Sequence, residues 1–527
     1  MQGHPALRYS EVIIKEFILK NILEYLEKSA GMYPDKIAFA DPDKEITYSE
    51  LVQRARGLGR ALYRIVKEPR KPVPVFMGKS VDTISVFFGA VYAGCFYSLL
   101  DTKQPRARLL DILATLEQDF IITSHVYDEE IAEFGFDGRI WYLEDLEAEA
   151  VEPEDDELLE KIRAQALDID PLYCNFTSGS TGVPKGVVVG HRSVIDFIDI
   201  FTEIFGFNET DVFGNQAPFD FDVSVKDIYS TIACGATMQI IPTKYFSIPT
   251  QLLDFLCDRH CTVLTWAVSA MCIVTTLHGF DYKIPTEVKK VFFSGEVMPI
   301  RHLTAWQEAL PEAMFVNLYG PTEITCNCTY FIVDRKYERG EVLPSGIPFP
   351  NEKVFLLDDE DKLVTEKNVN GEICVSGTAL ALGYYNNPEQ TAKAFVQNPL
   401  NRKYLEPIYR TGDLAYYNED GQICFATRKD FQIKHMGHRI ELGEIEAAMD
   451  AVPQIERACC IFANNKINAF YIGNIDKKEL SQQLGTRLPK FMIPNTFRQM
   501  ESLPITKNGK IDRKALTEEY LMRKKRG

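Results

Sequence analysis

The sequence has few of the features that mark a specialised structural class. Its 527 residues include twelve cysteines but no CxxC pair, no basic and apolar leader, and no excess of positive charge. These absences argue against zinc fingers, redox motifs and secretion, so we expect buried thiols in a reducing cytoplasm. The net charge of −17 is the opposite of what a phosphate backbone attracts. We therefore expect no nucleic-acid partner.

Charge is unevenly distributed along the chain. Residues 128–160 hold fifteen acidic residues against the single base Arg139, which predicts a solvated acidic surface. Residues 83–100, by contrast, contain no charged side chain and reach the length of a membrane span. Because this run includes three Ser or Thr residues and two glycines, we expect a buried helix that continues into a core strand. We expect no membrane insertion.

Helical and strand-like periodicities alternate through most of the chain, which predicts an α/β architecture. The apolar spacing over 21–28 predicts an amphipathic helix. The β-branched and aromatic runs 187–189 and 291–293 predict buried strands.

The pattern changes towards the C-terminus. It predicts a short helix over 440–449, two strands within 458–472 and a helix over 478–484, which is enough for a small α+β unit of about 100 residues. The sequence therefore predicts a large N-terminal multi-sheet α/β domain over 1–428 and a small C-terminal α+β domain over 429–527.

One segment concentrates the groups that bind phosphate. Residues 177–186 have the sequence Thr-Ser-Gly-Ser-Thr-Gly-Val-Pro-Lys-Gly between two apolar runs, which predicts a loop between two strands. Glycines let backbone amides point inward, hydroxyls donate hydrogen bonds and the lysine adds a positive charge, which suits a polyphosphate. Because a proline precedes the lysine, the loop is not of the Walker A type. The candidate residues are Thr177, Ser178, Gly179, Ser180, Thr181, Gly182 and Lys185.

This loop resembles the signature of the adenylate-forming enzymes, which include acyl-CoA synthetases, luciferases and amino-acid adenylation domains. The resemblance extends in the family's order from residue 46 to residue 513. The last blocks are typical of the amino-acid-activating branch, which contains the adenylation domains of nonribosomal peptide synthetases and the stand-alone D-alanine–carrier-protein ligases. The matching blocks are 46–51, 92–101, 317–323, 371–377 with 383–384, 409–414, 428–430, 432–434, 437–446, 488–494 and 508–513.

The resemblance implies a large α/β domain, a small mobile domain and a reaction in two steps. In the first step, a carboxylate attacks the α-phosphate of ATP in the presence of Mg²⁺, giving an aminoacyl-adenylate and pyrophosphate. In the second, the phosphopantetheine thiol of a carrier protein attacks this anhydride and forms a thioester. Catalysis of the first step is expected to depend on electrostatic stabilisation and alignment, because negative charge concentrates at one phosphorus.

The resemblance also implies roles for individual residues. Lys510 corresponds to the lysine that bridges the substrate carboxylate and the α-phosphate, and Thr322 to an α-phosphate contact. Glu323 is the expected magnesium ligand, since Mg²⁺ prefers hard oxygen donors. Asp430 corresponds to the hinge about which the small domain rotates. Thr427 departs from the family, which usually has glycine there, and a β-branched residue resists positive φ.

Four further residues are expected to bind the nucleoside. Tyr319 should stack on adenine, with Asn317 at the edge of the base. Asp413 corresponds to the acid that accepts both ribose hydroxyl protons, and Arg428 to a second ribose contact.

Asp222 aligns with an aspartate that pairs with the substrate α-ammonium in amino-acid-activating relatives. Acyl-CoA synthetases have no reason to carry such an acid, so Asp222 supports an α-amino substrate. Lys226 leaves two possibilities open. It could face the pocket and pair with an acidic substrate side chain, because an unpaired buried ammonium is costly. It could instead extend outward beside a small substrate such as alanine or serine. The resemblance carries over the pocket positions Asp222, Val223, Lys226, Thr265, Phe292, Ser294, Leu318, Cys326 and Asn327.

Two other functions compete with amino-acid activation. An acyl- or aryl-CoA synthetase would share the fold, but Asp222 and the C-terminal blocks argue against it. A catalytically inactive scaffold module would be expected to lack Lys185, Glu323 or Lys510, and all three are present. We therefore expect an ATP-dependent ligase that loads an amino acid onto a carrier protein.

Overall fold

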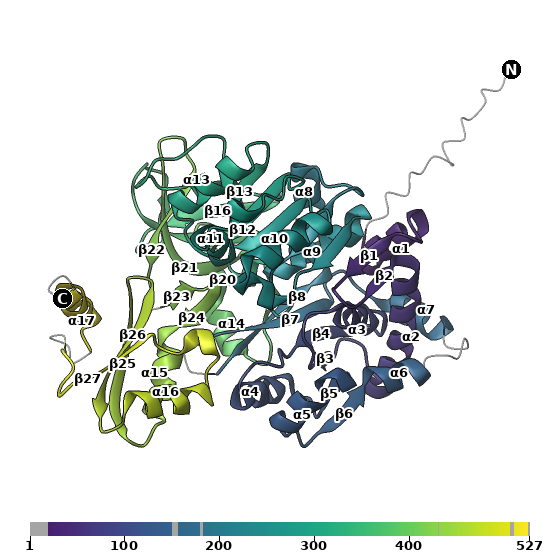
Figure 1. Ribbon diagram of the computed structural model, residues 1–527, viewed down its shortest axis with the longest axis horizontal. Coiled ribbons are helices and arrows are strands. Elements are labelled where there is room, and N and C mark those ends of the chain that lie inside the picture. The colour runs from purple at the N-terminus through teal and green to yellow at the C-terminus, as the bar shows by residue number, and fades with distance from the viewer. Residues whose placement is uncertain (1–18, 150–155, 180–182, 430–431, 506–510, 525–527) are drawn as a thin grey trace.

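The computed structural model describes residues 19–149, 156–179, 183–429, 432–505 and 511–524. Within them the chain forms a large N-terminal α/β domain with three sheets and a small C-terminal domain with two more (Figure 1). The predicted fold class is confirmed.

The first sheet has the strand order β15-β14-β13-β12-β11-β9-β10-β1-β2. From β13 to β1 all neighbours are parallel, and parallel neighbours need crossover connections, here mostly helices. The strand predicted at 291–293 lies in β12. The bounds are β1 Ile37–Ala40, β2 Glu45–Thr47, β9 Val212–Asn215, β10 Thr237–Ile240, β11 Val263–Ala267, β12 Lys290–Ser294, β13 Met314–Tyr319, β14 Thr329–Ile332 and β15 Ile347–Pro348.

The second sheet has the order β19-β8-β7-β4-β3-β5-β6. Its strands β7 and β8 are antiparallel, so the predicted phosphate loop connects two neighbouring strands, and the strand expected at 187–189 lies in β8. The bounds are β3 Pro72–Val75, β4 Phe96–Leu99, β5 Phe120–Thr123, β6 Arg139–Tyr142, β7 Pro171–Thr177, β8 Lys185–Gly190 and β19 Gly383–Tyr384.

The third sheet is antiparallel, with the order β17-β16-β18-β21-β20 and β22 beside β21. Thr427 lies in β22 opposite Leu414 and has no positive φ. The strain expected from the missing glycine is therefore not present. The bounds are β16 Glu352–Leu357, β17 Leu363–Val364, β18 Gly371–Gly377, β20 Phe395–Gln397, β21 Pro407–Tyr417 and β22 Ile423–Arg428.

The small domain combines a β23-β24 hairpin with a β25-β26-β27 sheet. The two strands expected within 458–472 and the helix expected over 478–484 are present. The helix expected from residue 440 begins at Leu442, because Ile440 and Glu441 pair with β23 instead. The bounds are β23 Gln432–His435, β24 His438–Glu441, α15 Leu442–Asp450, β25 Ile455–Ala463, β26 Lys466–Gly473, α16 Lys477–Gly485, β27 Thr496–Gln499 and α17 Arg513–Lys524.

Helices cover the sheets of the large domain (Figure 1). The helix predicted over 21–28 is α1. The α-helices are α1 Leu23–Met32, α2 Tyr48–Val66, α3 Val81–Tyr92, α4 Arg106–Leu116, α5 Asp128–Phe134, α6 Leu143–Glu149, α7 Asp156–Gln165, α8 His191–Phe205, α9 Val223–Cys234, α10 Pro249–Asp258, α11 Val268–Thr276, α12 Gly279–Tyr282, α13 Ile300–Ala309 and α14 Pro388–Ala394. Short 3₁₀ turns lie at η1 His125–Tyr127, η3 Thr243–Ser247, η4 Thr322–Ile324 and η5 Lys490–Met492.

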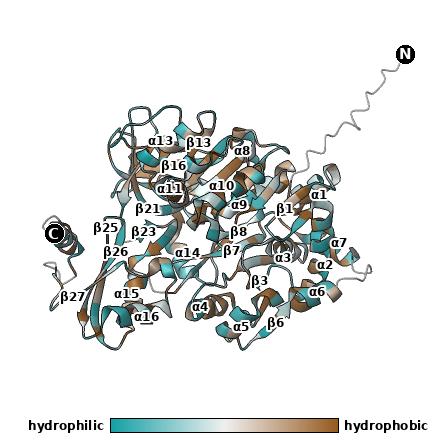
Figure 2. Cartoon of the chain, viewed as in Figure 1, coloured by the Kyte–Doolittle hydropathy of each residue, from teal (hydrophilic) through white to brown (hydrophobic). Residues whose placement is uncertain are grey.

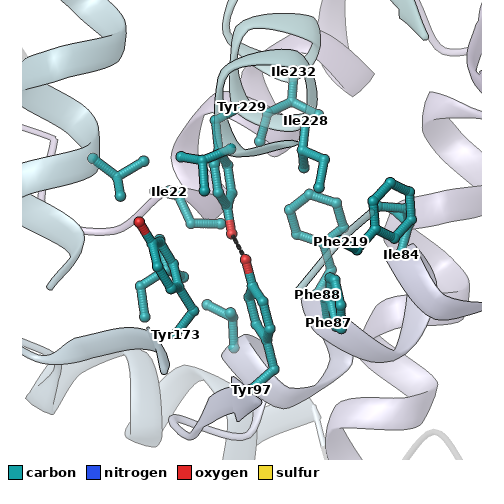
Figure 3. Packing of buried hydrophobic residues seen from close by; sticks show 14 of the residues in the cluster. Ile22, Ile84, Phe87, Phe88, Tyr97, Tyr173, Phe219, Ile228, Tyr229 and Ile232 are labelled. Atoms are coloured by element: carbon teal, nitrogen blue, oxygen red, sulfur yellow. Dashed lines mark hydrogen bonds between the residues drawn. The ribbon is translucent and has the colours of Figure 1, made fainter. Parts of the chain in front are cut away.

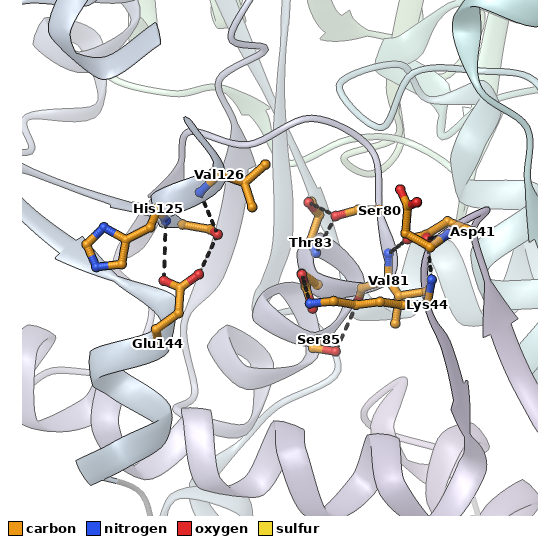
Figure 4. Close-up of polar contacts among 12 residues, drawn as sticks. Asp41, Lys44, Ser80, Val81, Thr83, Ser85, His125, Val126 and Glu144 are labelled. Atoms are coloured by element: carbon orange, nitrogen blue, oxygen red, sulfur yellow. Dashed lines mark hydrogen bonds and ion pairs between the residues drawn. The ribbon is translucent and has the colours of Figure 1, made fainter. Parts of the chain in front are cut away.

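The uncharged run 83–100 forms most of α3 and then the buried strand β4, as predicted. Ser80 caps the helix by accepting a hydrogen bond from the Thr83 amide, and the Asp41 carboxylate accepts one from the Val81 amide (Figure 4). These acceptors satisfy amides that a helix N-terminus leaves free. Among the described residues, no helix is long and apolar enough to cross a membrane.

Hydrophobic residues line the strands and the helix faces that meet them (Figure 2), and one cluster joins the first two sheets. Tyr97 of β4 and Tyr229 of α9 share a hydrogen bond of 2.7 Å between their hydroxyls, and Phe87 stacks on Tyr97 at 3.9 Å (Figure 3). A buried tyrosine pair adds a satisfied hydrogen bond to its apolar contact area. This packing fixes α9, whose N-terminus carries Asp222 and Lys226.

Candidate functional site

The β7–β8 loop lies where the second sheet faces the small domain. A Cβ on Gly179 would lie 1.9 Å from the carbonyl oxygen of Val183, so the loop can close only with glycine there. The hydroxyl of Thr177 is buried without a hydrogen-bond partner among the described residues, which suits an absent acceptor. Residues 180–182, which include three predicted phosphate contacts, lie outside the described residues.

The loop donates hydrogen bonds to the small domain. Ser178 Oγ donates to the carbonyl oxygen of Arg439 at 2.8 Å. The amide of Gly179 donates to Glu444 Oε2 at 3.1 Å. Both predicted phosphate donors therefore engage oxygen acceptors.

Lys185 begins β8 and is almost fully buried. Its ammonium lies 3.9 Å from Glu441 Oε1 and 5.5 Å from the ring centroid of Tyr384. Glu441 also accepts a hydrogen bond from Gln432 at 2.6 Å. The lysine therefore adds positive charge beside the loop, as its place in the sequence predicts.

Glu323 lies in η4, directly after β13, and is 0% exposed. Tyr384 Oη donates to one carboxylate oxygen at 2.7 Å, and Arg439 Nη1 donates to the other at 2.6 Å. Burial acts to raise the pKa of Glu323, but the Arg439 charge and the Tyr384 hydrogen bond outweigh it and hold the pKa below its ordinary value. The carboxylate is therefore ionised and already paired.

Glu323 fits the expected magnesium ligand by chemistry, with one condition. Mg²⁺ is commonly held by one or two carboxylates together with substrate phosphates, and a buried ionised glutamate beside a phosphate loop supplies that donor. No cluster of three or more potential ligands occurs among the described residues, so the phosphates would complete the shell. The guanidinium of Arg439 must first leave the carboxylate, because two cations repel each other there.

The predicted nucleoside residues lie on adjoining strands. Asp413 of β21 stands opposite Arg428 of β22 and forms an ion pair with it at 2.5 Å, while Tyr319 Oη donates to the other oxygen of Asp413 at 2.5 Å. Asn317 donates to the carbonyl oxygen of Pro344 at 2.7 Å. All four predicted residues line a cavity of about 960 Å³ between the domains, which is large enough for a nucleotide.

The predicted ammonium-binding residue Asp222 directly precedes α9. Burial raises its pKa, and Lys226 and a hydrogen bond with Thr322 act in the opposite direction. The thiol of Cys326 donates to the Asp222 carbonyl oxygen at 3.1 Å. Asp222 therefore lies beside the turn that carries Glu323, where a carboxylate and an ATP phosphate would need to meet.

Lys226 is 1% exposed, and its ammonium donates to Asn327 Oδ1 at 2.9 Å. The expectation that Lys226 extends outward is wrong. Asn327 follows the turn after η4, in which Thr325 and Cys326 have positive φ. The expectation that Lys226 faces inward remains.

The other pocket residues share one face of the first sheet. Thr265 stands opposite Phe292 in the register of β11 and β12, and Phe292 stands opposite Val316. Side chains two residues apart on a strand point to the same side, which adds Ser294 and Leu318. Phe292 lies in the same core cluster as Val225 of α9. Val223, in the first turn of α9, is half-buried.

Several residues at this site have no predicted role. Arg439, Glu441 and Glu444 lie in the family block 437–446, whose density of charged residues was the available signal. Arg108 lies in no block, and its ion pair with Glu444 joins residues 336 positions apart, so no local pattern could reveal it. The predicted catalytic Lys510 and hinge Asp430 lie outside the described residues.

Comparison with known proteins agrees with this geometry. The chain matches the model of the AMP-binding enzyme family over residues 26–385 and that of the AMP-binding enzyme C-terminal domain over residues 444–510. Zwittermicin A synthase ZmaJ of Bacillus cereus is 31% identical, and the match covers 94% of each chain.

Two other relatives are longer than this chain. Tyrocidine synthase 1 of Brevibacillus parabrevis is 29% identical over 95% of this chain and is matched over 45% of its own length. The dimodular nonribosomal peptide synthase of Bacillus subtilis (strain 168) is 31% identical over 94% of this chain, and the match covers 21% of that protein. The chain therefore spans less than half of either relative.

Solved structures show the same fold. The Vibrio cholerae adenylation domain AlmE, in complex with glycyl-adenosine-5'-phosphate, has a TM-score of 0.82 at 22% identity and covers 97% of this chain and 99% of its own. PA1221, a protein containing adenylation and PCP domains, has a TM-score of 0.79 at 23% identity over 94% of this chain and 84% of its own.

His438 is a half-buried ring at the junction of the two domains. It stacks on Phe491 at 3.5 Å between centroids and meets Phe221 edge-on at 4.6 Å. Burial, followed by the charges of His435 and Arg108, lowers its pKa to about 3. In the folded protein the ring is therefore neutral at about pH 6.5, where the same histidine in the unfolded chain begins to bind a proton.

This depressed pKa predicts a pH-dependent stability. Below about pH 6.5 the unfolded state binds a proton at this histidine that the folded state does not, so stability falls as the pH decreases towards 3. In urea-unfolding curves between pH 8 and pH 4, His438→Phe should lose less stability than the wild type on acidification. His125→Phe, which alters an exposed histidine stacked on Tyr142, should not. Parallel pH profiles for wild type and His438→Phe would contradict the prediction.

Proposed function

Because this chain belongs to the AMP-binding enzyme family, we propose that it uses ATP to activate the carboxylate of an α-amino acid as an aminoacyl-adenylate, releasing pyrophosphate. The observation that carries the proposal is the half-buried carboxylate of Asp222 beside the Glu323 turn. An α-ammonium group would pair directly with this charge, whereas a fatty or aryl acid offers it no positively charged group. The AlmE structure, whose bound ligand is a glycyl-adenylate, supports the same class of substrate.

In this proposal the residues of the β7–β8 loop bind the ATP phosphates. Ser178, Gly179 and Lys185 already donate to or lie near oxygen atoms, and Thr177 has a hydroxyl without a partner among the described residues. Magnesium, when bound, would neutralise phosphate charge, and Glu323 would hold it.

The nucleoside would lie in the cavity between the domains. Tyr319 offers its ring to adenine while its hydroxyl is fixed by Asp413, and Arg428 fixes the other oxygen of that carboxylate. The Asp413 oxygens would accept from the ribose hydroxyls through their remaining lone pairs, since an ionised carboxylate has about four acceptor sites. Thr322 would contact the α-phosphate, one residue from Glu323.

The second step of the proposed function is transfer to the phosphopantetheine thiol of a carrier protein. The solved neighbour PA1221 contains adenylation and PCP domains, and NpsA-ThdA is an artificially fused adenylation–PCP di-domain; both support this partner. A reducing compartment is supported by the twelve cysteines, all of which are free thiols. Asp430 is the proposed hinge, with the small domain beginning at about residue 429.

The buried ammonium of Lys226 favours an acidic substrate side chain. Lys226 interacts with the charge of Asp222, and the substrate ammonium would claim that carboxylate. Burial raises the pKa of the other acidic neighbour, Asp227, to about 7, so Asp227 is only partly ionised at neutral pH. When the adenylate forms, the α-carboxylate of the substrate loses its negative charge in the mixed anhydride. A carboxylate on the substrate side chain would then supply the negative charge that pairs with the Lys226 ammonium. A small substrate is the alternative, in which Asn327 satisfies Lys226.

Amino-acid-dependent ATP–pyrophosphate exchange tests the function directly. With all proteinogenic amino acids and their D-forms as the panel, we expect exchange with glutamate or aspartate. Replacing the ammonium in Lys226→Met should reduce exchange with the acidic substrate by about 30-fold, since loss of one partner of a buried charge pair costs at least ~2 kcal/mol. Exchange with alanine or serine instead would contradict the acidic substrate and support the small one. Exchange only with fatty or aryl acids would overturn amino-acid activation.

Lys510→Ala tests the assigned catalytic lysine. Removing a charge that acts on the developing negative charge should reduce exchange by about 100-fold or more, while ATP binding, measured by calorimetry, persists. Lys478→Ala, an exposed lysine on α16 of the same domain, is the matched control and should retain wild-type exchange. Wild-type exchange by Lys510→Ala would contradict the assignment.

A further inference from the structure

A second carboxylate is buried beside the residues predicted to bind the substrate side chain. Asp227 of α9 is 0% exposed, and its Oδ2 accepts a hydrogen bond from Asn215 Nδ2 at 2.9 Å. Its other oxygen, Oδ1, is buried without a hydrogen-bond partner among the described residues. A buried acceptor of this kind is costly unless a proton, a water molecule or a ligand satisfies it. Asp227 Oδ1 is therefore available to a bound group.

A hydroxyl at a predicted pocket position faces the same carboxylate. Thr265 of β11 is 2% exposed and stands opposite Asn215 in the register with β9. Burial raises the pKa of Asp227, and the Asn215 hydrogen bond and then the Thr265 hydroxyl act in the opposite direction. The Thr265 hydroxyl nevertheless lacks a partner of hydrogen-bond geometry among the described residues. The pocket thus brings together a carboxylate oxygen and a hydroxyl that both lack a partner in this part of the chain.

Two lysines act on the charge of Asp227. Lys226 precedes it on the same helix. Lys79, in the connection between β3 and α3, donates to Asn215 Oδ1 at 3.2 Å, and burial lowers its pKa to about 7. Cys326, after η4, is a further titratable neighbour, and burial raises the pKa of its thiol. The strands β9 and β11 present neutral side chains. The charge of Asp227 is therefore set against cations rather than against other acids.

We propose that Asp227 is a specificity-determining residue that distinguishes a side-chain carboxylate from the corresponding carboxamide by its own protonation state. The inference rests on the proposed function, because it places the substrate side chain between Lys226 and Thr265. When Asp227 is protonated, its O–H donates to one oxygen of a substrate carboxylate, and the other oxygen accepts from Lys226. When Asp227 is ionised, its Oδ1 accepts from the N–H of a carboxamide whose carbonyl oxygen accepts from Lys226.

Charge balance separates these two combinations from the other two. A substrate carboxylate pairs with Lys226 while Asp227 is neutral, and a neutral carboxamide leaves Lys226 to pair with the ionised Asp227. An acid beside the ionised Asp227 would bring two carboxylates together, which repel each other. An amide beside the protonated Asp227 would leave a buried ammonium unpaired. Above neutral pH, an acidic substrate would therefore bind together with one proton taken from the solvent.

The ratio of two exchange activities tests the proposal in the wild-type protein. ATP–pyrophosphate exchange would be measured as kcat/KM for glutamate against glutamine, and for aspartate against asparagine, between about pH 6 and pH 8.5. Burial raises the pKa of Asp227 to about 7. The acid-to-amide ratio should therefore fall by about tenfold for each pH unit above neutrality, because one proton separates the two forms. Effects of pH on ATP, magnesium and protein stability are common to both substrates and cancel in this ratio.

Three variants assign the pH dependence to this residue. Asp227→Asn keeps the shape of the side chain without a titrating group, so its acid-to-amide ratio should stay constant over the same range. Lys79→Met removes a positive charge that counteracts burial at Asp227, so the ratio should begin to fall at a higher pH. Asp254→Asn changes an acid of α10 that pairs with Lys283, and this matched control should follow the wild type.

Each outcome bears on a different part of the account. A constant wild-type ratio, exchange with only one member of each pair at both ends of the pH range, or parallel profiles for wild type and Asp227→Asn would overturn the role of Asp227 and leave amino-acid activation standing. Exchange with alanine or serine alone would overturn that role together with the acidic substrate. Exchange with no amino acid at any pH would overturn both this inference and the proposed function.

Discussion

A fully buried carboxylate must be paired, and Glu323 is the carboxylate on which the arrangement of this protein depends. It follows β13 of the first sheet, accepts a hydrogen bond from Tyr384 of β19 in the second, and pairs with Arg439 of β24 in the small domain. Three sheets are thus joined at one ionised side chain. Desolvating a single charge costs several kcal/mol. Tyr384 and Arg439 must therefore both be in place on Glu323 whenever the two domains are docked.

The same requirement extends to the neighbouring charges. Asp222 and Lys226 compensate each other near the N-terminus of α9, and Lys185 faces Glu441. A substrate can enter such a site only by replacing one of these partners with a group of equal charge. For this reason the proposed substrate is an amino acid whose α-ammonium pairs with Asp222 and whose acidic side chain pairs with Lys226.

The sequence alone predicted the elements that local periodicity determines. The strands at 187–189 and 291–293 and the loop at 177–186 follow from β-branched runs and from glycine and hydroxyl density. The start of α15 was misplaced because Ile440 and Glu441 fit a helical pattern as well as a strand, and only pairing with β23 decides between them.

The site was less accessible to sequence reasoning. The burial of Lys226 depends on a turn about one hundred residues away, so its outward alternative could not be excluded from local composition. The partnership of Arg108 with Glu444 depends on how two domains meet. The family blocks predicted that Asp413, Arg428 and Tyr319 bind the nucleoside. The structure adds their contacts: Asp413 stands opposite Arg428 in the register of β21 and β22, and Tyr319 donates a hydrogen bond to Asp413.

A crystal structure with a non-hydrolysable glutamyl-adenylate analogue tests the central claim most directly. The account predicts that the analogue's α-ammonium lies on the Asp222 carboxylate, with its side-chain carboxylate on Lys226 and its adenine against Tyr319. An analogue bound with its ammonium turned away from Asp222 would contradict the assignment of this chain as an amino-acid-activating enzyme.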